Sequence, residues 1–143
     1  MPAFSPDGHW IAYSSGETGE SELYVRPFPG PDAKRRISAA GGSFPFWSPS
    51  GHQLFFTTRD EHIMVVDYAA KDNDFVHSAP RIWSDQRFLR NPGGGPFPPV
   101  ALAPDGKRFA VMLYPSGSAE RTGLRLTFLL NFFDELQRRV SEK

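Results

Sequence analysis

The sequence repeats one short motif three times, and this repeat limits what the chain can fold into more than any other feature. An apolar segment leads into a proline, an Asp or Ser and a glycine, and a second apolar segment follows. The copies span 2–13, 45–56 and 100–111. The glycine supplies the positive φ of a two-residue hairpin turn, and the proline ends the first strand because it cannot donate to a β-ladder. Each copy therefore predicts a β-hairpin with a two-residue turn.

Two more strands are expected after each of the first two hairpins. Residues 23–25 and 63–66 have the composition of third strands, and 36–38 and 81–84 share an Arg-Ile start and are expected to form fourth strands. The turn prolines lie more than forty residues apart. A period of about 40–45 residues is typical of a four-stranded β-propeller blade.

The second strand of the repeat is apolar on both faces, at 54–56 and 109–113. A sheet covered on both sides has such runs, and a propeller blade lies between two others, whereas a two-layer sandwich favours alternation. We therefore predict an all-β fold, a partial β-propeller of three four-stranded antiparallel blades in a single domain. Its expected parts are blade 1 at 2–38, blade 2 at 44–84, an interblade loop at 85–99 and blade 3 at 100–130.

The third copy ends differently from the other two. A strand is expected near 124–130, after the polar segment 115–123. Apolar residues at helical spacing follow, with Asn131 as a candidate N-cap. We expect an incomplete last blade of three strands and a short C-terminal α-helix at about 132–141.

Composition excludes several classes of function. Among 143 residues, 39% are hydrophobic and 14% aromatic, which predicts a folded core. The 16 Lys and Arg balance 16 Asp and Glu, which argues against nucleic-acid binding, and the absence of Cys excludes disulfides and thiolate chemistry. The first residues lack a signal-peptide pattern, and the apolar run at 126–133 is too short to cross a bilayer. We therefore expect a soluble chain without membrane insertion.

No catalytic motif is found in the sequence. The Gly-x-Ser-x-Gly elbow of α/β-hydrolases is absent, and Ser5, Ser48 and Asp7 recur with the repeat, so they are expected to hydrogen-bond within turns. His9 and His52 share a repeat position that is lysine in the third copy, which predicts that they face solvent. No histidine pair has the spacing of a metal site. We expect no catalytic residue, no metal and no cofactor.

Two loops are candidates for a ligand or partner face. Arg59, Asp60 and His62 lie between the second and third strands of blade 2, and Arg87 and Arg90 lie in the long interblade segment. Propeller geometry puts these two kinds of loop on one face of the ring, and a connection of this length is uncommon without a function. We predict that these five residues bind a ligand or partner; the alternative is a solvated turn and an interblade loop without a role.

Several motifs also resemble a known family. Besides Ser-Pro-Asp-Gly at 5–8 and its variants at 48–51 and 103–106, they are 24–30 (Tyr-Val-Arg-Pro-Phe-Pro-Gly), 41–42 (Gly-Gly), 47–49 (Trp-Ser-Pro) and 130–136 (Leu-Asn-Phe-Phe-Asp-Glu-Leu). The chain resembles TolB-like, WD-type propeller repeats of bacteria, above all the C-terminal sensor propeller of bacterial membrane serine/threonine protein kinases. The resemblance implies an extracytoplasmic sensor domain for the parent protein. It does not imply kinase activity, because the kinase motifs are absent from this sequence.

The expected function is therefore binding rather than catalysis. We predict a non-enzymatic propeller module, a scaffold or sensor, that recognises a protein or a small ligand. One alternative is a small esterase-like or peptidase-like hydrolase whose site forms on oligomerisation, and another is a propeller fragment without independent function. Three blades make about half of a ring of the usual four to eight, so we expect a homodimer that completes a six-bladed ring.

Overall fold

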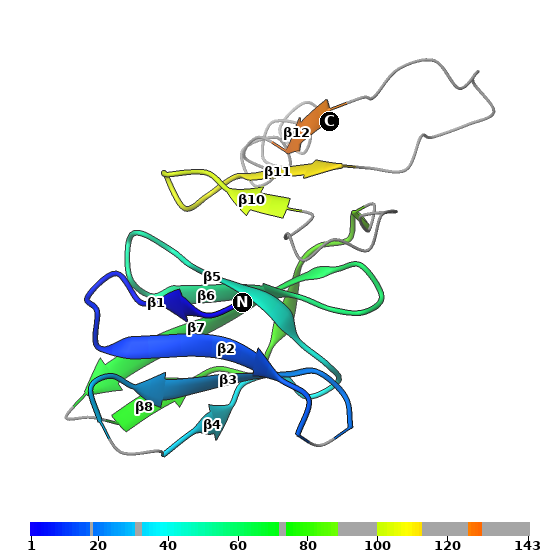
Figure 1. Ribbon diagram of the computed structural model, residues 1–143. Helices are drawn as coiled ribbons and strands as arrows, with labels where there is room; N and C mark the ends of the chain where they lie inside the picture. The colour runs from blue at the N-terminus through cyan, green and yellow to red at the C-terminus, as the bar shows by residue number, and fades with distance from the viewer. Residues whose placement is uncertain (18, 31–32, 72–73, 89–99, 113–125, 130–143) are drawn as a thin grey trace, which may run out of the picture. The chain divides into compact units, whose positions relative to one another are not determined.

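The computed structural model describes residues 1–17, 19–30, 33–71, 74–88, 100–112 and 126–129 (Figure 1). They form antiparallel sheets, which confirms the all-β prediction, and no helix occurs among them. The expected helix at 132–141 and most of the interblade loop lie outside the described residues. None of the described segments is a helix long and apolar enough to cross a membrane. The chain divides into two compact units, Met1–Arg87 and Phe88–Lys143.

The first sheet of the first unit follows the order of the chain. Its strands are β1 (Ala3–Phe4), β2 (Trp10–Ser15), β3 (Glu22–Pro27) and β4 (Arg35–Arg36), each antiparallel to the next. The β2–β3 pair is the longest, and Trp10 opposite Pro27 and Ser15 opposite Glu22 mark its two ends. A meander of this kind needs only short connections between neighbouring strands.

The second sheet has one strand more than the sequence predicts. It contains β5 (Ser43–Trp47), β6 (Gln53–Thr57), β7 (Ile63–Lys71), β8 (Asp74–His77) and β9 (Arg81–Ser84). The start of β7 pairs with β6 and β9, and its second half pairs with β8. The expected third strand at 63–66 is therefore only the first half of β7, and the β7–β8 hairpin extends beyond it.

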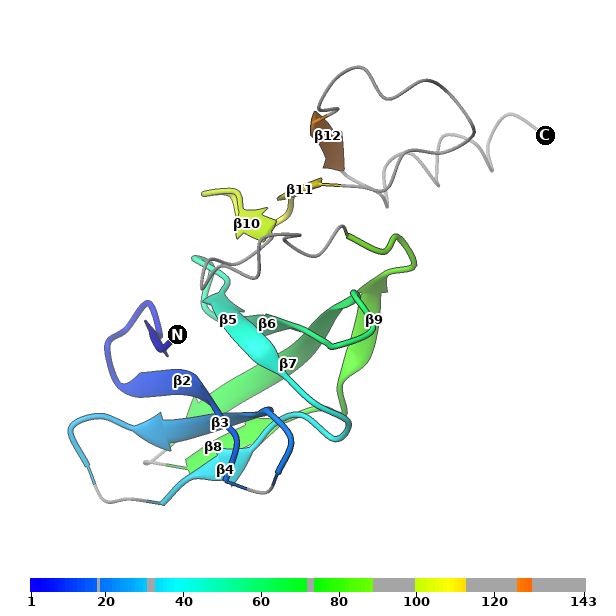
Figure 2. The ribbon, with the colours of Figure 1, turned by 45° about the vertical axis from the view of Figure 1, so that its right-hand side comes forward.

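The two sheets share one hydrophobic core. Strand β5 lies against β1, β2 and β3, and β8 lies beside β3 and β4 in both ribbon views (Figures 1 and 2). Arg35 on β4 pairs with Asp74 on β8. The buried residues of this core are Trp10, Ala12, Leu23, Val25, Ile37, Trp47, Leu54, Phe56, Val66, Tyr68 and Phe75. The hairpin thus carries aromatic side chains of the second repeat onto the first sheet.

The hairpin turn of the first repeat is longer than predicted. Gly8 N–H donates to the Ser5 carbonyl oxygen at 2.9 Å, and Ser5 N–H donates to the Trp10 carbonyl oxygen at 2.9 Å. The connection is therefore four residues, 6–9, and not two. Pro6 fits the second position of such a turn because its φ is fixed and it has no N–H to lose, and Gly8 has the expected positive φ of 74°.

The other two repeats have the same turn. The corresponding bonds join Ser48 with Gly51 and Gln53, and Ala103 with Gly106 and Arg108. The two glycines again have positive φ, 68° in each case. Three stretches of sequence that resemble one another therefore also share their backbone hydrogen bonds.

The described part of the second unit is one antiparallel sheet. Its strand order is β10 (Val100–Leu102), β11 (Phe109–Met112) and β12 (Leu126–Leu129). Val100 lies opposite Val111, and Phe109 lies opposite Leu129. This sheet contains the third copy of the turn, between β10 and β11.

Candidate functional site

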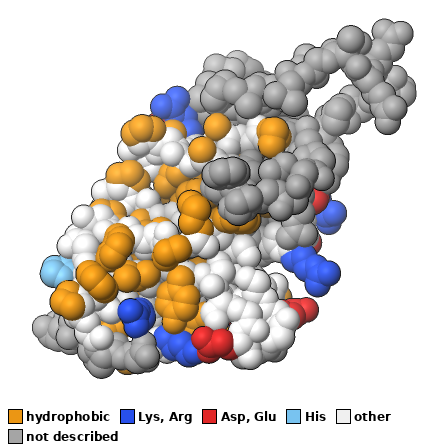
Figure 3. Space-filling view, viewed as in Figure 1, with side chains coloured by type: hydrophobic (Ala, Val, Ile, Leu, Met, Phe, Trp, Pro, Cys, Tyr) orange, Lys and Arg blue, Asp and Glu red, His pale blue; other side chains and the backbone are white. Residues whose placement is uncertain are grey.

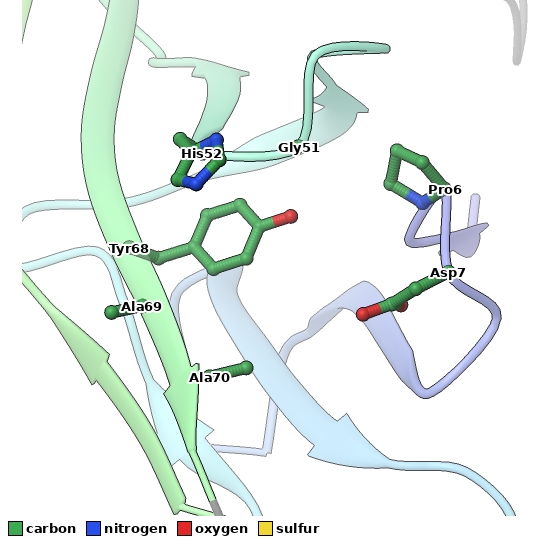
Figure 4. Close-up of a pocket in the computed structure, with 7 residues that line it drawn as sticks. All are labelled: Pro6, Asp7, Gly51, His52, Tyr68, Ala69 and Ala70. Carbon is green, nitrogen blue, oxygen red and sulfur yellow. The ribbon is translucent and has the colours of Figure 1, made fainter.

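A pocket lies between the turns of the first two repeats. Its volume is about 290 Å³, and β7 forms its floor (Figure 4). The lining residues are Pro6, Asp7, Gly51, His52, Tyr68, Ala69 and Ala70. The pocket thus takes two residues from the β1–β2 turn, two from the β5–β6 turn and three from the second half of β7.

Asp7 is the exposed carboxylate of this pocket. Ser5 Oγ donates to Asp7 Oδ1 at 2.5 Å, and the His9 N–H donates to the same oxygen at 3.0 Å. These bonds, the Ser5 bond first, hold the pKa of the Asp7 carboxyl below its usual range. Oδ2 accepts no hydrogen bond from the described part of the chain. The turn therefore fixes one carboxylate oxygen, and the second has no partner among the described residues.

Tyr68 is nine-tenths buried, with 9% of its surface exposed. Its ring stacks on Phe75 at 5.0 Å and meets the Trp47 ring edge-on at 5.0 Å. Its hydroxyl points out of the strand toward the side of the pocket where Asp7 lies (Figure 4), and no described residue hydrogen-bonds to it. Burial raises the pKa of the Tyr68 hydroxyl, and the charge of Asp7 raises it further. The hydroxyl is therefore protonated at neutral pH.

His52 forms the third polar wall of the pocket. It is exposed, as its repeat position predicts. Nδ1 lies 3.1 Å from the Ser50 carbonyl oxygen. Because a carbonyl oxygen only accepts, Nδ1 carries the proton, and Nε2 is the atom left for solvent or a ligand. The Tyr68 N–H donates to the His52 carbonyl oxygen at 2.9 Å, which fastens the middle of β7 to this turn.

The structure brings together two of the five residues predicted as a binding face. His62 Nδ1 lies 3.1 Å from Asp60 Oδ2 in the β6–β7 turn. The side chain of Thr58, with a smaller effect from His62, holds the pKa of the Asp60 carboxyl below its usual range. Arg59 is exposed and makes no hydrogen bond or ion pair with this Asp60–His62 pair within the described residues.

The two remaining predicted residues belong to the segment 85–99. Arg87 is exposed at the end of the first unit, and among the described residues it makes no hydrogen bond or ion pair with Asp60 or His62. Arg90 lies outside the described residues. The pocket and the β6–β7 turn are at opposite ends of β6, because one turn precedes this strand and the other follows it.

Sequence reasoning missed the pocket because Asp7 and His52 were assigned to the turns and Tyr68 lay beyond the predicted strand. The sequence nevertheless indicates that the strand continues as far as Tyr68. Residues 63–70 contain no glycine or proline, and Asp-Asn-Asp follows at 72–74, a sequence typical of turns. Within the described residues, no three His, Asp or Glu side chains gather where they could hold a metal ion.

Comparison with curated proteins gives a distant similarity. No family model matches the chain. The chain is 28% identical over 122 residues to a protein of Agrobacterium fabrum (strain C58) named "Uncharacterized protein Atu1656". The match covers 79% of this chain and 39% of that protein, so the chain spans about two fifths of its relative's length. This relative's name assigns it no activity.

Proposed function

We propose that the chain is part of a β-propeller and that it binds a ligand in the pocket between its first two repeats, as a sensor or scaffold module. The observation that carries the proposal is the pocket itself. Equivalent turns of two successive repeats form its sides, and Asp7 and Tyr68 each direct an unused polar group into it. Ligand sites are typically concave, largely apolar and supplied with a few convergent polar groups.

The propeller assignment is supported by the relation of the repeats to the sheets. Each of the three sheets begins with the strand that precedes the repeated turn. The first two are separate sheets that pack through one aromatic core, as neighbouring blades do. The resemblance to bacterial sensor propellers agrees with this arrangement and with a role in binding.

Binding is favoured over catalysis because the hydroxyl groups of the turns are already used. Ser5 Oγ bonds to Asp7 and accepts from the Trp10 N–H at 2.9 Å. Ser48 Oγ lies 2.7 Å from Ser50 Oγ. The pocket lining has no Ser, Thr, Cys or Lys that could act as a nucleophile beside His52. A hydrolase would need such a group from a second copy.

The exposed apolar surface supports association with a partner. Hydrophobic side chains reach the surface that Figure 3 shows, and the large exposed ones among the described residues are Met1, Phe4, Phe28, Val76 and Ile82. Phe4 and Phe28 pack edge-to-face at 5.0 Å, with 56% and 40% of their surfaces exposed. We propose a second copy of the chain as this partner, in a homodimer that completes a six-bladed ring.

The binding function can be tested by amide NMR on the full chain. Small amines, alcohols and carboxylates are titrated, and saturable shifts of the Gly51, His52, Ala69 and Ala70 amides are expected from at least one class. Ala70→Leu should abolish the shifts by filling the pocket, because its Cβ lies on the same side of β7 as the Tyr68 side chain (Figure 4), whereas Ala101→Leu, at an exposed position on β10, should not. In parallel, p-nitrophenyl ester hydrolysis that is lost in His52→Ala or His62→Ala would favour the hydrolase and contradict the proposal.

A further inference from the structure

We infer that the pocket binds an ammonium group, from a lysine side chain or a small free amine, between the Asp7 carboxylate and the Tyr68 hydroxyl. The inference rests on the proposed binding function and names its ligand class. It follows from three properties of the pocket: its charge, the unpartnered hydroxyl, and the shape and polarity of its walls.

The charge of the pocket favours a cation. Asp7 is the one carboxylate among the lining residues, and none of them is Lys or Arg. Its Oδ1 is occupied by Ser5 and the His9 N–H, so Oδ2 remains as an acceptor for a charge-assisted hydrogen bond. An anionic ligand would meet this carboxylate without any cation to offset it.

Tyr68 adds a second, fixed acceptor. Its ring is held by Phe75 and Trp47, so the hydroxyl keeps its place in the pocket. No described residue hydrogen-bonds to this hydroxyl, and it is not among the fully buried polar atoms without a partner. It is therefore open to solvent in the free protein, and a ligand that donates a hydrogen bond can take the place of water there. An ammonium carries three donors and no acceptor. It can therefore donate to the phenol oxygen and to Asp7 Oδ2 together.

The remaining walls suit the alkyl chain of an amine. Pro6, Ala69 and Ala70 are apolar, and the Tyr68 and His52 rings border the same space (Figure 4). Aromatic ring faces attract cations and also pack against methylene groups. A volume of about 290 Å³ is at the lower limit for ligand pockets, which fits a short chain better than a nucleotide or a large cofactor.

The test compares three probes that differ in charge and share one alkyl chain. Pentylamine, 1-pentanol and pentanoate are titrated at equal concentrations against the full chain at neutral pH. We expect saturable shifts of the Gly51, His52, Ala69 and Ala70 amides with pentylamine and weaker shifts with the other two. Equal or tighter binding of pentanol or pentanoate at these amides would overturn the ammonium inference and leave the binding function standing. If no probe moves them, the proposed binding site itself fails.

Two variants test the two contacts separately. Asp7→Asn removes the charge but keeps an acceptor for Ser5 and for the His9 N–H, and Tyr68→Phe removes the hydroxyl but keeps the ring. Each should weaken pentylamine binding about tenfold, the usual effect of losing a hydrogen bond to a charged group. Asp105→Asn removes the carboxylate from the same turn position of the third repeat and should leave the affinity unchanged. Unchanged affinity in Asp7→Asn would overturn the inference.

A second comparison, between a peptide and pentylamine, shows whether the ammonium group comes from a protein lysine or from a small free amine. A capped Gly-Lys-Gly peptide presents a lysine side chain without a free α-amine, whereas pentylamine represents a small metabolite. Peptide binding at least as tight as that of pentylamine would identify a protein lysine. Binding of pentylamine alone would identify a small amine. Both results support an ammonium site, and failure of both ligands at the four amides would overturn it.

Discussion

The Trp47 indole Nε1–H donates a hydrogen bond to the Ala3 carbonyl oxygen at 2.9 Å, across 44 residues of sequence. Ala3 is on β1 and Trp47 ends β5, so this bond joins the first strands of two successive repeats. The indole is also buried, and its ring packs against Tyr68 and Phe75. One side chain therefore links the backbone of the first sheet to the β7–β8 hairpin of the second.

Replacement of Trp47 by Phe tests this link. Phe keeps an aromatic ring but loses the donor and part of the buried surface, so the Ala3 carbonyl oxygen loses its partner. We expect the free energy of unfolding to fall by about 1–3 kcal/mol. Urea denaturation followed by circular dichroism measures the change. A variant as stable as the parent would show that the bond contributes nothing to the joint between repeats.

The β7–β8 hairpin predicts a sharp contrast between two neighbouring residues. Phe75 is 1% exposed and packs on Trp10 and Tyr68, whereas Val76 is 57% exposed. Phe75→Ala should cost about 3–5 kcal/mol because it leaves a cavity in the core. Val76→Ala should change stability by less than about 0.5 kcal/mol. Thermal unfolding of both proteins measures the difference, and similar melting temperatures would contradict the described position of β8.

Gly42 is a position where a side chain has no room. A Cβ there would lie 2.8 Å from Ser38 Cβ and 2.9 Å from Leu23 Cβ. Gly42→Ala should therefore destabilise the protein by about 1–3 kcal/mol, as overpacking does. The matched control is Gly16→Ala, where a Cβ meets nothing within 4 Å. It should be neutral or slightly stabilising, so equal losses in the two variants would contradict the packing around Gly42.

Acid should remove part of the stability that the first turn provides. The Ser5 hydroxyl, and then the His9 N–H, lower the pKa of the Asp7 carboxyl in the folded state below its ordinary value. A carboxyl with a lowered folded pKa contributes stability above its unfolded pKa and loses it as the pH falls through the folded pKa. Melting temperatures measured from about pH 6 down to pH 3 should therefore fall less steeply for Asp7→Asn than for the parent. Parallel curves would contradict a contribution from this carboxylate.

The ring proposal predicts the mass of the protein in solution. Three repeats provide at most three blades, and propellers usually have four to eight. A dimer that completes six blades should have twice the 16.0 kDa of one chain in light scattering. A single species at 16.0 kDa across the concentration range would contradict the proposed dimer. It would not bear on ligand binding in the pocket, which the NMR titration tests separately.

The repeated turns could be predicted from the sequence because their chemistry is local. Pro6 and Gly8 restrict the backbone whatever surrounds them, and the same bonds return around Gly51 and Gly106. The antiparallel, all-β character followed from these turns and from the apolar runs between them. The predicted turn length was wrong. A proline at the second position of the turn and a glycine at the fourth suit a four-residue connection better than a two-residue one.

The β7–β8 hairpin and the pocket depend on distant parts of the chain, and local pattern did not reveal them. Strand β7 continues past the predicted third strand, and Tyr68 and Phe75 on this hairpin pack with Trp10 and Trp47 in the shared core. Asp7 and Tyr68 come together only when the two sheets pack. By contrast, the Asp60–His62 pair arises within one turn, and its two residues are separated in the sequence by Glu61 alone.

Because Asp7 comes from one repeat and Tyr68 from the next, neither repeat alone forms the whole pocket. Such a pocket lies at the junction between two neighbouring repeats. An open row of repeats has one junction fewer than it has repeats, whereas a closed ring has as many junctions as repeats. The residue at the Asp7 position is Ser50 in the second copy and Asp105 in the third. Substitution at that one position can therefore change the charge that a junction presents without altering the turn that holds it.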